Sequence, residues 1–205
     1  MIKAIETRYA GCHFRSRLEA RWAVFFDHME IAWEYEPEAF ETSAGNYLPD
    51  FRIESPGYRS SPCWFEVKPD RFISDARHAA LVAGTGNMPF IVAAGMPRDY
   101  RDQLRGAESA LKVMFGYWER QGGGISEAFP CAFVGVKRAR PEWRIPGSCP
   151  GHWDFIADGR LWSCDQQDGV HVAVKDPHDH DHHPPYGSSD IDAAYAAARS
   201  ERFGR

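Results

Sequence analysis

The sequence predicts a mixed α/β fold, because one helix-type pattern stands among several short segments of the strand type. Residues 16–29 repeat apolar side chains with the period of a helix, on one stripe formed by Leu18, Trp22, Phe25, Phe26 and Met29. Two apolar runs bounded by turn residues, 63–68 (CWFEVK) and 89–94 (PFIVAA), are typical of buried strands. With 205 residues, the chain is long enough to bury a substantial core as one compact domain.

The composition is ordinary for a soluble globular protein, with 43% apolar and 26% charged residues. The chain has no run of eighteen apolar residues and no basic-then-apolar N-terminus. We therefore expect no membrane contact and a cytoplasmic location, with the five cysteines mostly reduced. The net charge of −5 argues against a protein that coats nucleic acid nonspecifically. It does not exclude a nucleic-acid enzyme, because acidic residues that bind metal also lower the net charge.

After the first helix, the sequence predicts three extended segments. Residues 31–36 alternate apolar and acidic side chains, which is the period of a half-exposed strand, and Pro37 ends the strand. A turn at 43–46 leads into a second extended segment, 47–53. A loop rich in Ser, Pro and Gly then joins this segment to the strand 63–68.

A second helix begins at Ser74 or Asp75 and runs to about Val82, where glycines end it before the strand 89–94. Farther along, we predict a helix over 98–120, anchored by Leu104, Leu111, Met114 and Trp118. The sequence then predicts a strand at 132–136, short β-like pieces at 161–162 and 170–174, and a final helix over 191–203.

Charged side chains stand on the predicted strand 63–68, where burial is unfavourable unless they are paired or bound. Side chains two residues apart on a strand point the same way, so Glu66 and Lys68 share one face. We expect the preceding extended segment to pair with this strand and to bring Asp50 near Glu66. Glu19 borders the apolar stripe of the first helix and leans towards the sheet. Three carboxylates and a lysine at one sheet edge suit Mg²⁺ or Mn²⁺, which prefer oxygen ligands.

These segments resemble the PD-(D/E)xK nucleases. The resemblance is carried by SRLE on the first helix, YLPDF on the second extended segment and WFEVKP on the strand after it. Within the superfamily, the sequence is most similar to the TnsA-type transposon endonucleases and related phage and bacterial nucleases. The family's core order matches the elements predicted for 16–94. The resemblance therefore implies a restriction-endonuclease-like core at 1–95, with an α+β extension at 96–205 that completes the sheet.

The resemblance implies a metal-dependent DNA endonuclease of phage, mobile-element or defence context. Asp50 and Glu66 would bind the Mg²⁺ or Mn²⁺ ion, together with the backbone carbonyl of Val67. Lys68 would be the catalytic lysine, and Glu19 would assist the metal through water. The resemblance also implies a protein partner that positions or activates the enzyme, whereas the oligomeric state and the structure of the substrate stay open.

Each site residue also has a purely structural interpretation. Ser16-x-x-Glu19 is a capping box, in which Glu19 bonds back to the start of the helix. Asp50 follows a proline, as turn residues often do, and Glu66 with Lys68 could be a surface ion pair. The alternative function is a catalytically silent nuclease-fold subunit that binds DNA or another protein.

Basic residues near the predicted site are candidates for phosphate contacts, namely Arg15, Arg17, Arg21 and Arg71. Residues 178–183 hold four histidines among aspartates, which we interpret as a solvated loop. Cys149, His152 and Cys164 form part of a zinc ligand set but lack the paired Cys-x-x-Cys spacing. A small binding module with a structural Zn²⁺ is therefore an alternative rather than the expectation.

Overall fold

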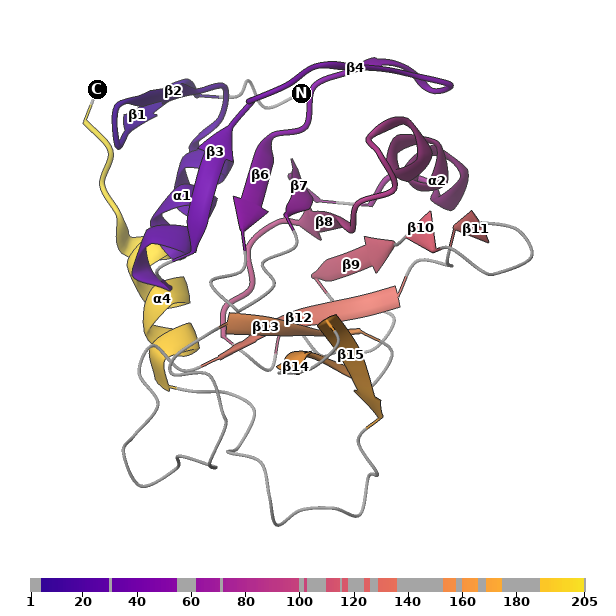
Figure 1. The fold of residues 1–205 in the computed structure, drawn as a ribbon. Helices are drawn as coiled ribbons and strands as arrows, with labels where there is room; N and C mark the ends of the chain where they lie inside the picture. The colour runs from indigo at the N-terminus through magenta and orange to yellow at the C-terminus, as the bar shows by residue number, and fades with distance from the viewer. Residues whose placement is uncertain are drawn as a thin grey trace.

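The structure, a computed structural model, is a mixed α/β protein built on one large sheet with helices against both faces (Figure 1). None of the helices it describes has the length and apolar character that a membrane crossing requires. The structure describes residues 5–29, 31–54, 62–70, 72–99, 102, 110–114, 116–117, 124–125, 129–135, 153–157, 160–165, 169–174 and 189–204.

The described helices are α1 (Arg17–His28), α2 (Asp75–Gly84) and α4 (Ser189–Ser200). The strands of the first half are β1 (Thr7–Tyr9), β2 (Cys12–Phe14), β3 (Ala32–Tyr35), β4 (Phe40–Thr42), β5 (Gly45–Tyr47), β6 (Phe51–Glu54), β7 (Cys63–Lys68) and β8 (Phe90–Ala94). Those of the second half are β9 (Leu111–Met114), β10 (Gly116–Tyr117), β11 (Gly124–Ile125), β12 (Phe129–Gly135), β13 (Trp153–Ala157), β14 (Arg160–Asp165) and β15 (Gly169–Val174).

The large sheet has the strand order β15-β14-β13-β12-β9-β8-β7-β6-β3. Strands β3, β6 and β7 are antiparallel neighbours, whereas β8 lies parallel to β7 after the crossover through α2. The predicted order of helix, three strands, helix and strand is therefore confirmed in α1, β3, β6, β7, α2 and β8. Strands β9 and β12 to β15 continue the same sheet beyond β8.

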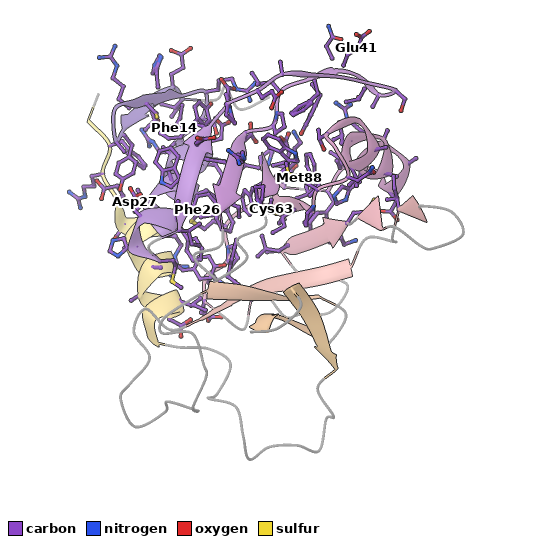
Figure 2. The ribbon with its side chains drawn as sticks, in the orientation of Figure 1. Phe14, Phe26, Asp27, Glu41, Cys63 and Met88 are labelled. Carbon is purple, nitrogen blue, oxygen red and sulfur yellow. The ribbon has the colours of Figure 1, made fainter. Side chains whose placement is uncertain are left out.

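Helix α1 anchors one face of the sheet through aromatic packing. Ser16 caps its first turn, and the predicted apolar stripe turns inward, with Trp22, Phe25 and Phe26 fully buried. The Trp22 ring lies 4.8 Å from that of Phe65 in β7, and the Phe25 ring stacks 4.5 Å from Tyr195 in α4. Figure 2 shows Phe26 among the side chains packed between helix and sheet. Burial of each such side chain contributes roughly 1.5–3 kcal/mol, so α1 is fixed firmly beside the strands.

Helix α2 covers the opposite face. Leu81 and Val82 pack with Trp64, whose side chain points away from α1 because it alternates with Phe65 along β7. The helix ends as the glycines predict, with Gly86 in the left-handed conformation at φ 83°. The N–H of the next residue, Asn87, donates to the Val82 carbonyl over 2.9 Å, which is a Schellman cap.

The helix predicted over 98–120 is wrong at residues 111–114 and 116–117, which form strands β9 and β10, whereas the described residue Asp102 is helical. Leu111 and Met114 are both buried and stand three residues apart, as on a helix face. However, Leu111 packs with the core on the α1 side and Met114 with the core on the α2 side. A strand buried on both faces produces this spacing as readily as a helix does. Leu104 and Trp118 lie outside the described residues.

The extended segment predicted at 47–53 is also divided in two. Its first residue, Tyr47, closes the hairpin β4–β5, which reaches across to α2 (Figure 1). Figure 2 shows Glu41 of this hairpin pointing outward, and its side chain is exposed. Strand β6 begins at Phe51, so Asp50 lies directly before the strand rather than within it. The predicted strands at 132–136, 161–162 and 170–174 and the final helix are confirmed as β12, β14, β15 and α4.

Candidate active site

Glu36, Asp50 and Glu66 lie in one row: Glu36 directly follows β3, Asp50 directly precedes β6, and Glu66 lies within β7. Phe51 of β6 pairs with Phe65 of β7, so continuing this antiparallel register by one residue sets Asp50 opposite Glu66. On the β3 side, the Glu36 N–H donates to the Asp50 carbonyl over 2.9 Å. The pairing expected from the sequence therefore does bring Asp50 and Glu66 together, and it adds a third carboxylate beside them.

Asp50 and Glu66 are both buried, each with 3% of its surface exposed. One oxygen of each carboxylate accepts from the backbone: Asp50 Oδ2 from the Val67 N–H at 2.7 Å, and Glu66 Oε2 from the Asp50 N–H at 3.4 Å. The other oxygen of each faces a side-chain cation. Arg15 Nη2 lies 2.7 Å from Asp50 Oδ1, and Lys68 Nζ forms an ion pair with Glu66 Oε1.

Burial and the neighbouring Glu66 charge raise the pKa of Asp50 to about 8. The Val67 N–H and the Lys68 ammonium act in the opposite direction, but they do not offset these two effects. Near neutral pH the Asp50 carboxyl therefore tends to retain a proton. A divalent cation bound to the Asp50 carboxyl would favour the ionised form of that group.

Lys68 ends strand β7, and the core fixes its backbone. The Gly95 N–H donates to the Lys68 carbonyl over 2.6 Å, and the Trp22 indole N–H donates to the Gly95 carbonyl over 3.1 Å. Gly95 adopts a φ of 78°, a left-handed conformation that suits glycine. The Lys68 side chain is 33% exposed, so the side chain is partly open to solvent while its backbone stays fixed.

The Val67 backbone faces Asp50. Within a strand, the N–H and C=O of one residue point to the same side, and the Val67 N–H points to Asp50 on the β6 side. The Val67 carbonyl therefore points to that side too, which is the orientation that the predicted metal contact requires.

Glu19 has the contacts of a capping residue. Its N–H donates to Ser16 Oγ over 3.2 Å, and its own Oε1 accepts from the Ser16 hydroxyl at 2.7 Å. Its Oε2 accepts from the Tyr35 hydroxyl at 2.6 Å and from the Arg15 N–H at 3.1 Å. The structural interpretation of Ser16-x-x-Glu19 is thus observed, and a role of Glu19 beside a metal stays a prediction.

Two residues near the site were not anticipated from the sequence. The Glu36 side chain is only 23% exposed, and its Oε1 lies 2.6 Å from Arg15 Nε. Its backbone has a φ of 46°, a conformation that costs a residue other than glycine roughly 1–2 kcal/mol. The Tyr47 hydroxyl is buried near Glu66, and burial together with the Glu66 charge raises its pKa. It makes no hydrogen bond of normal geometry to any residue in the described ranges.

The other predicted contacts are only partly described. Arg17 is exposed in the first turn of α1, whereas Arg21 is half-buried and its Nε has no hydrogen-bond partner among the described residues. Arg71 lies outside the described residues, as do the histidine run at 178–183 and both Cys149 and His152. Cys164 lies in β14.

Comparison with protein-family models, curated proteins and solved structures finds no match. The chemistry of the candidate site therefore rests on its own residues.

The donor set fits a hard divalent cation. Among the described residues, the carboxylates of Glu36, Asp50 and Glu66 form ion pairs with two cationic partners, Arg15 and Lys68, and the Glu19 carboxylate lies beside them. The carboxylates outnumber these two cations. Across the described ranges, no three His, Cys, Asp or Glu side chains converge as a complete metal cage. Mg²⁺, however, is usually held by one or two carboxylates and completes its shell with water and substrate phosphates. The two oxygens now facing Arg15 and Lys68 are the ones available to such an ion.

Proposed function

We propose that this protein is a nuclease that hydrolyses phosphodiester bonds in DNA and depends on Mg²⁺ or Mn²⁺. The observation that carries the proposal is the buried pair of Asp50 and Glu66 with Lys68 beside it, at the ends of two paired strands. A buried carboxyl such as Asp50, whose pKa is raised by burial and by a neighbouring carboxylate, is unfavourable for stability in its ionised form, which is typical of sites that bind a cation. The SRLE, YLPDF and WFEVKP segments, which resemble the PD-(D/E)xK nucleases, support the same conclusion.

Three residues of the chain would share the chemistry. Asp50 and Glu66 would hold the divalent cation, which when bound lowers the pKa of a coordinated water and neutralises charge on the phosphate. Lys68 would orient the attacking water, because it ends β7, pairs with Glu66 and has a partly exposed side chain. Its positive charge would also stabilise the negative charge that develops on the phosphate oxygens.

The substrate and the biological context are the parts of the proposal that depend most on the resemblance. The TnsA-type similarity favours DNA as the substrate, a phage, mobile-element or defence context, and a partner protein that positions the enzyme. Arg17 is exposed at the first turn of α1, close along the chain to Arg15, and fits a phosphate contact there.

Cleavage and metal binding, measured on the same three proteins, test the proposal. Asp50→Ala should lose both Mn²⁺ binding and DNA cleavage, whereas Lys68→Ala should lose cleavage and still bind Mn²⁺. Glu41→Gln is the matched control, because it removes an exposed carboxylate on the β4–β5 hairpin and should change neither. Full cleavage by Lys68→Ala would remove Lys68 from the mechanism.

A catalytically silent nuclease-fold subunit is the second candidate. It is favoured by one observation, namely that Arg15 and Lys68 each pair with one oxygen of a buried carboxylate. A silent subunit would bind DNA or a partner equally well with EDTA or Mn²⁺. Asp50→Ala would then leave that binding unchanged, which separates the two candidates.

A further inference from the structure

We propose that Arg15 is a displaceable cation of this site: it leaves Asp50 when the metal binds, stays close because Glu36 holds it, and then contacts a substrate phosphate. Glu36 is thereby a positioning residue. This inference rests on the proposed function, since it requires both a metal and a phosphate substrate.

The Arg15 backbone is fixed while its side chain can move. Its N–H donates to Glu19 Oε2 and to the Tyr35 hydroxyl, each over 3.1 Å, directly before the Ser16 cap of α1. Its side chain, in contrast, is 57% exposed. A long side chain on a fixed backbone can exchange partners without disturbing the fold around it.

Arg15 and a metal would compete for the same atom. Asp50 Oδ2 is already engaged by the Val67 N–H, so Oδ1 is the oxygen left for a cation, and Arg15 Nη2 lies 2.7 Å from it. A guanidinium and a divalent ion repel each other at such a separation. Binding of the ion at Oδ1 must therefore displace the guanidinium or be weakened by it.

Glu36 would keep the displaced guanidinium in the site. Its Oε1 lies 2.6 Å from Arg15 Nε, as an ion pair in which the N–H bond does not point at the oxygen. The contact uses Nε, so the two terminal nitrogens stay available after Asp50 is released. A planar guanidinium can then donate two parallel hydrogen bonds to a phosphate, which a lysine cannot do.

Metal binding without substrate gives the decisive measurement. Arg15→Gln should bind Mn²⁺ about tenfold more tightly than the unmodified protein in calorimetric titration, because the competing charge is gone. The same variant should cleave DNA with a KM raised about tenfold, since the phosphate contact is lost. A merely structural role would loosen the site and weaken both. Arg8→Gln makes the same change at an exposed arginine of β1 and should shift neither.

Two further variants separate the roles of charge and position. Arg15→Lys keeps the charge but not the planar fork, so it should bind Mn²⁺ nearly as the unmodified protein does and still show a raised KM. Glu36→Gln should raise the KM and weaken Mn²⁺ binding severalfold, because a carboxylate is lost and Arg15 is left to Asp50 alone.

The outcomes distinguish this inference from the proposed function. Mn²⁺ binding that requires Asp50 but is not tightened by Arg15→Gln would overturn the inference and leave the nuclease proposal intact. Tighter Mn²⁺ binding with an unchanged KM would refute the phosphate contact. If the unmodified protein shows no Mn²⁺ binding that depends on Asp50, the proposed function fails, and the inference fails with it.

Discussion

Replacing Asp50 by asparagine should make the metal-free protein more stable while removing its proposed activity. Burial and the Glu66 charge raise the pKa of Asp50 from 3.8 to about 8. Between these two pH values, the folded protein keeps a proton that the unfolded chain has released. The stability contributed by this group is therefore fully present below pH 4 and is lost as the pH rises towards 8.

The size of the effect follows from the pKa shift. A shift of about four units, at about 1.4 kcal/mol per unit, sets a ceiling of about 6 kcal/mol above pH 8. Asparagine stays neutral and still offers an oxygen to the Val67 N–H, but it loses the ion pair with the half-exposed Arg15. We therefore expect a net gain of about 2 kcal/mol at pH 8. In a chain of this length, that corresponds to a rise of about 4–8 °C in Tm.

Thermal unfolding followed by circular dichroism in EDTA measures this gain. The Tm of the Asp50→Asn variant should exceed that of the unmodified protein at pH 8, and this difference should shrink or reverse at pH 5. Mn²⁺ at pH 8 should stabilise the unmodified protein but not Asp50→Asn, because a ligand stabilises the state that binds it. Glu41→Gln should behave as the unmodified protein at both pH values. A lower Tm for Asp50→Asn at pH 8, or a difference independent of pH, would refute the reasoning.

Three further predictions concern the surrounding fold. Gly84→Ala should lower the free energy of unfolding by about 1–3 kcal/mol in a urea titration, since its Cβ would lie 2.4 Å from Thr42 Cγ2. Adding Thr42→Gly to this variant should restore part of the loss. The control Gly204→Ala, whose Cβ would lie in open space, should leave the free energy of unfolding unchanged. Burial lowers the pKa of His78, so the unfolded chain takes up a proton more readily than the folded protein as the pH drops below about 6.5, and stability should fall. His78→Gln should lessen that fall, and equal pH profiles of the two proteins would contradict this prediction. Glu19→Ala should lower stability by about 1 kcal/mol, because it removes the oxygens that accept from Ser16 and Tyr35 at the start of α1, and an unchanged Tm would exclude the capping role.

The parts of the fold that the sequence predicts well have one strong local pattern each. Helix α1 follows from its apolar stripe and Ser16, and β7 follows from an apolar run between two prolines. Strand β9 was missed because the spacing of Leu111 and Met114 fits a helix face as well as a strand buried on both sides. Local periodicity does not distinguish these two cases; only the partner on each face does.

The candidate site also has contacts that the sequence predicts and contacts that it does not. The proximity of Asp50 and Glu66 could be predicted because it needs only two adjacent strands to pair in one register. The contact between Arg15 and Glu36 could not, because it depends on a left-handed backbone at Glu36 and joins segments far apart in the chain. The buried Tyr47 hydroxyl near Glu66 depends on the β4–β5 hairpin, for which the sequence showed only a turn.

The most direct test of the central claim is the conversion of supercoiled plasmid to nicked or linear DNA. The unmodified protein with Mg²⁺ or Mn²⁺ should cleave the plasmid. EDTA should abolish the reaction, and Asp50→Asn should be inactive although it is at least as stable. Cleavage that persists in Asp50→Asn, or a complete lack of cleavage by a protein that binds Mn²⁺ through Asp50, would contradict the account.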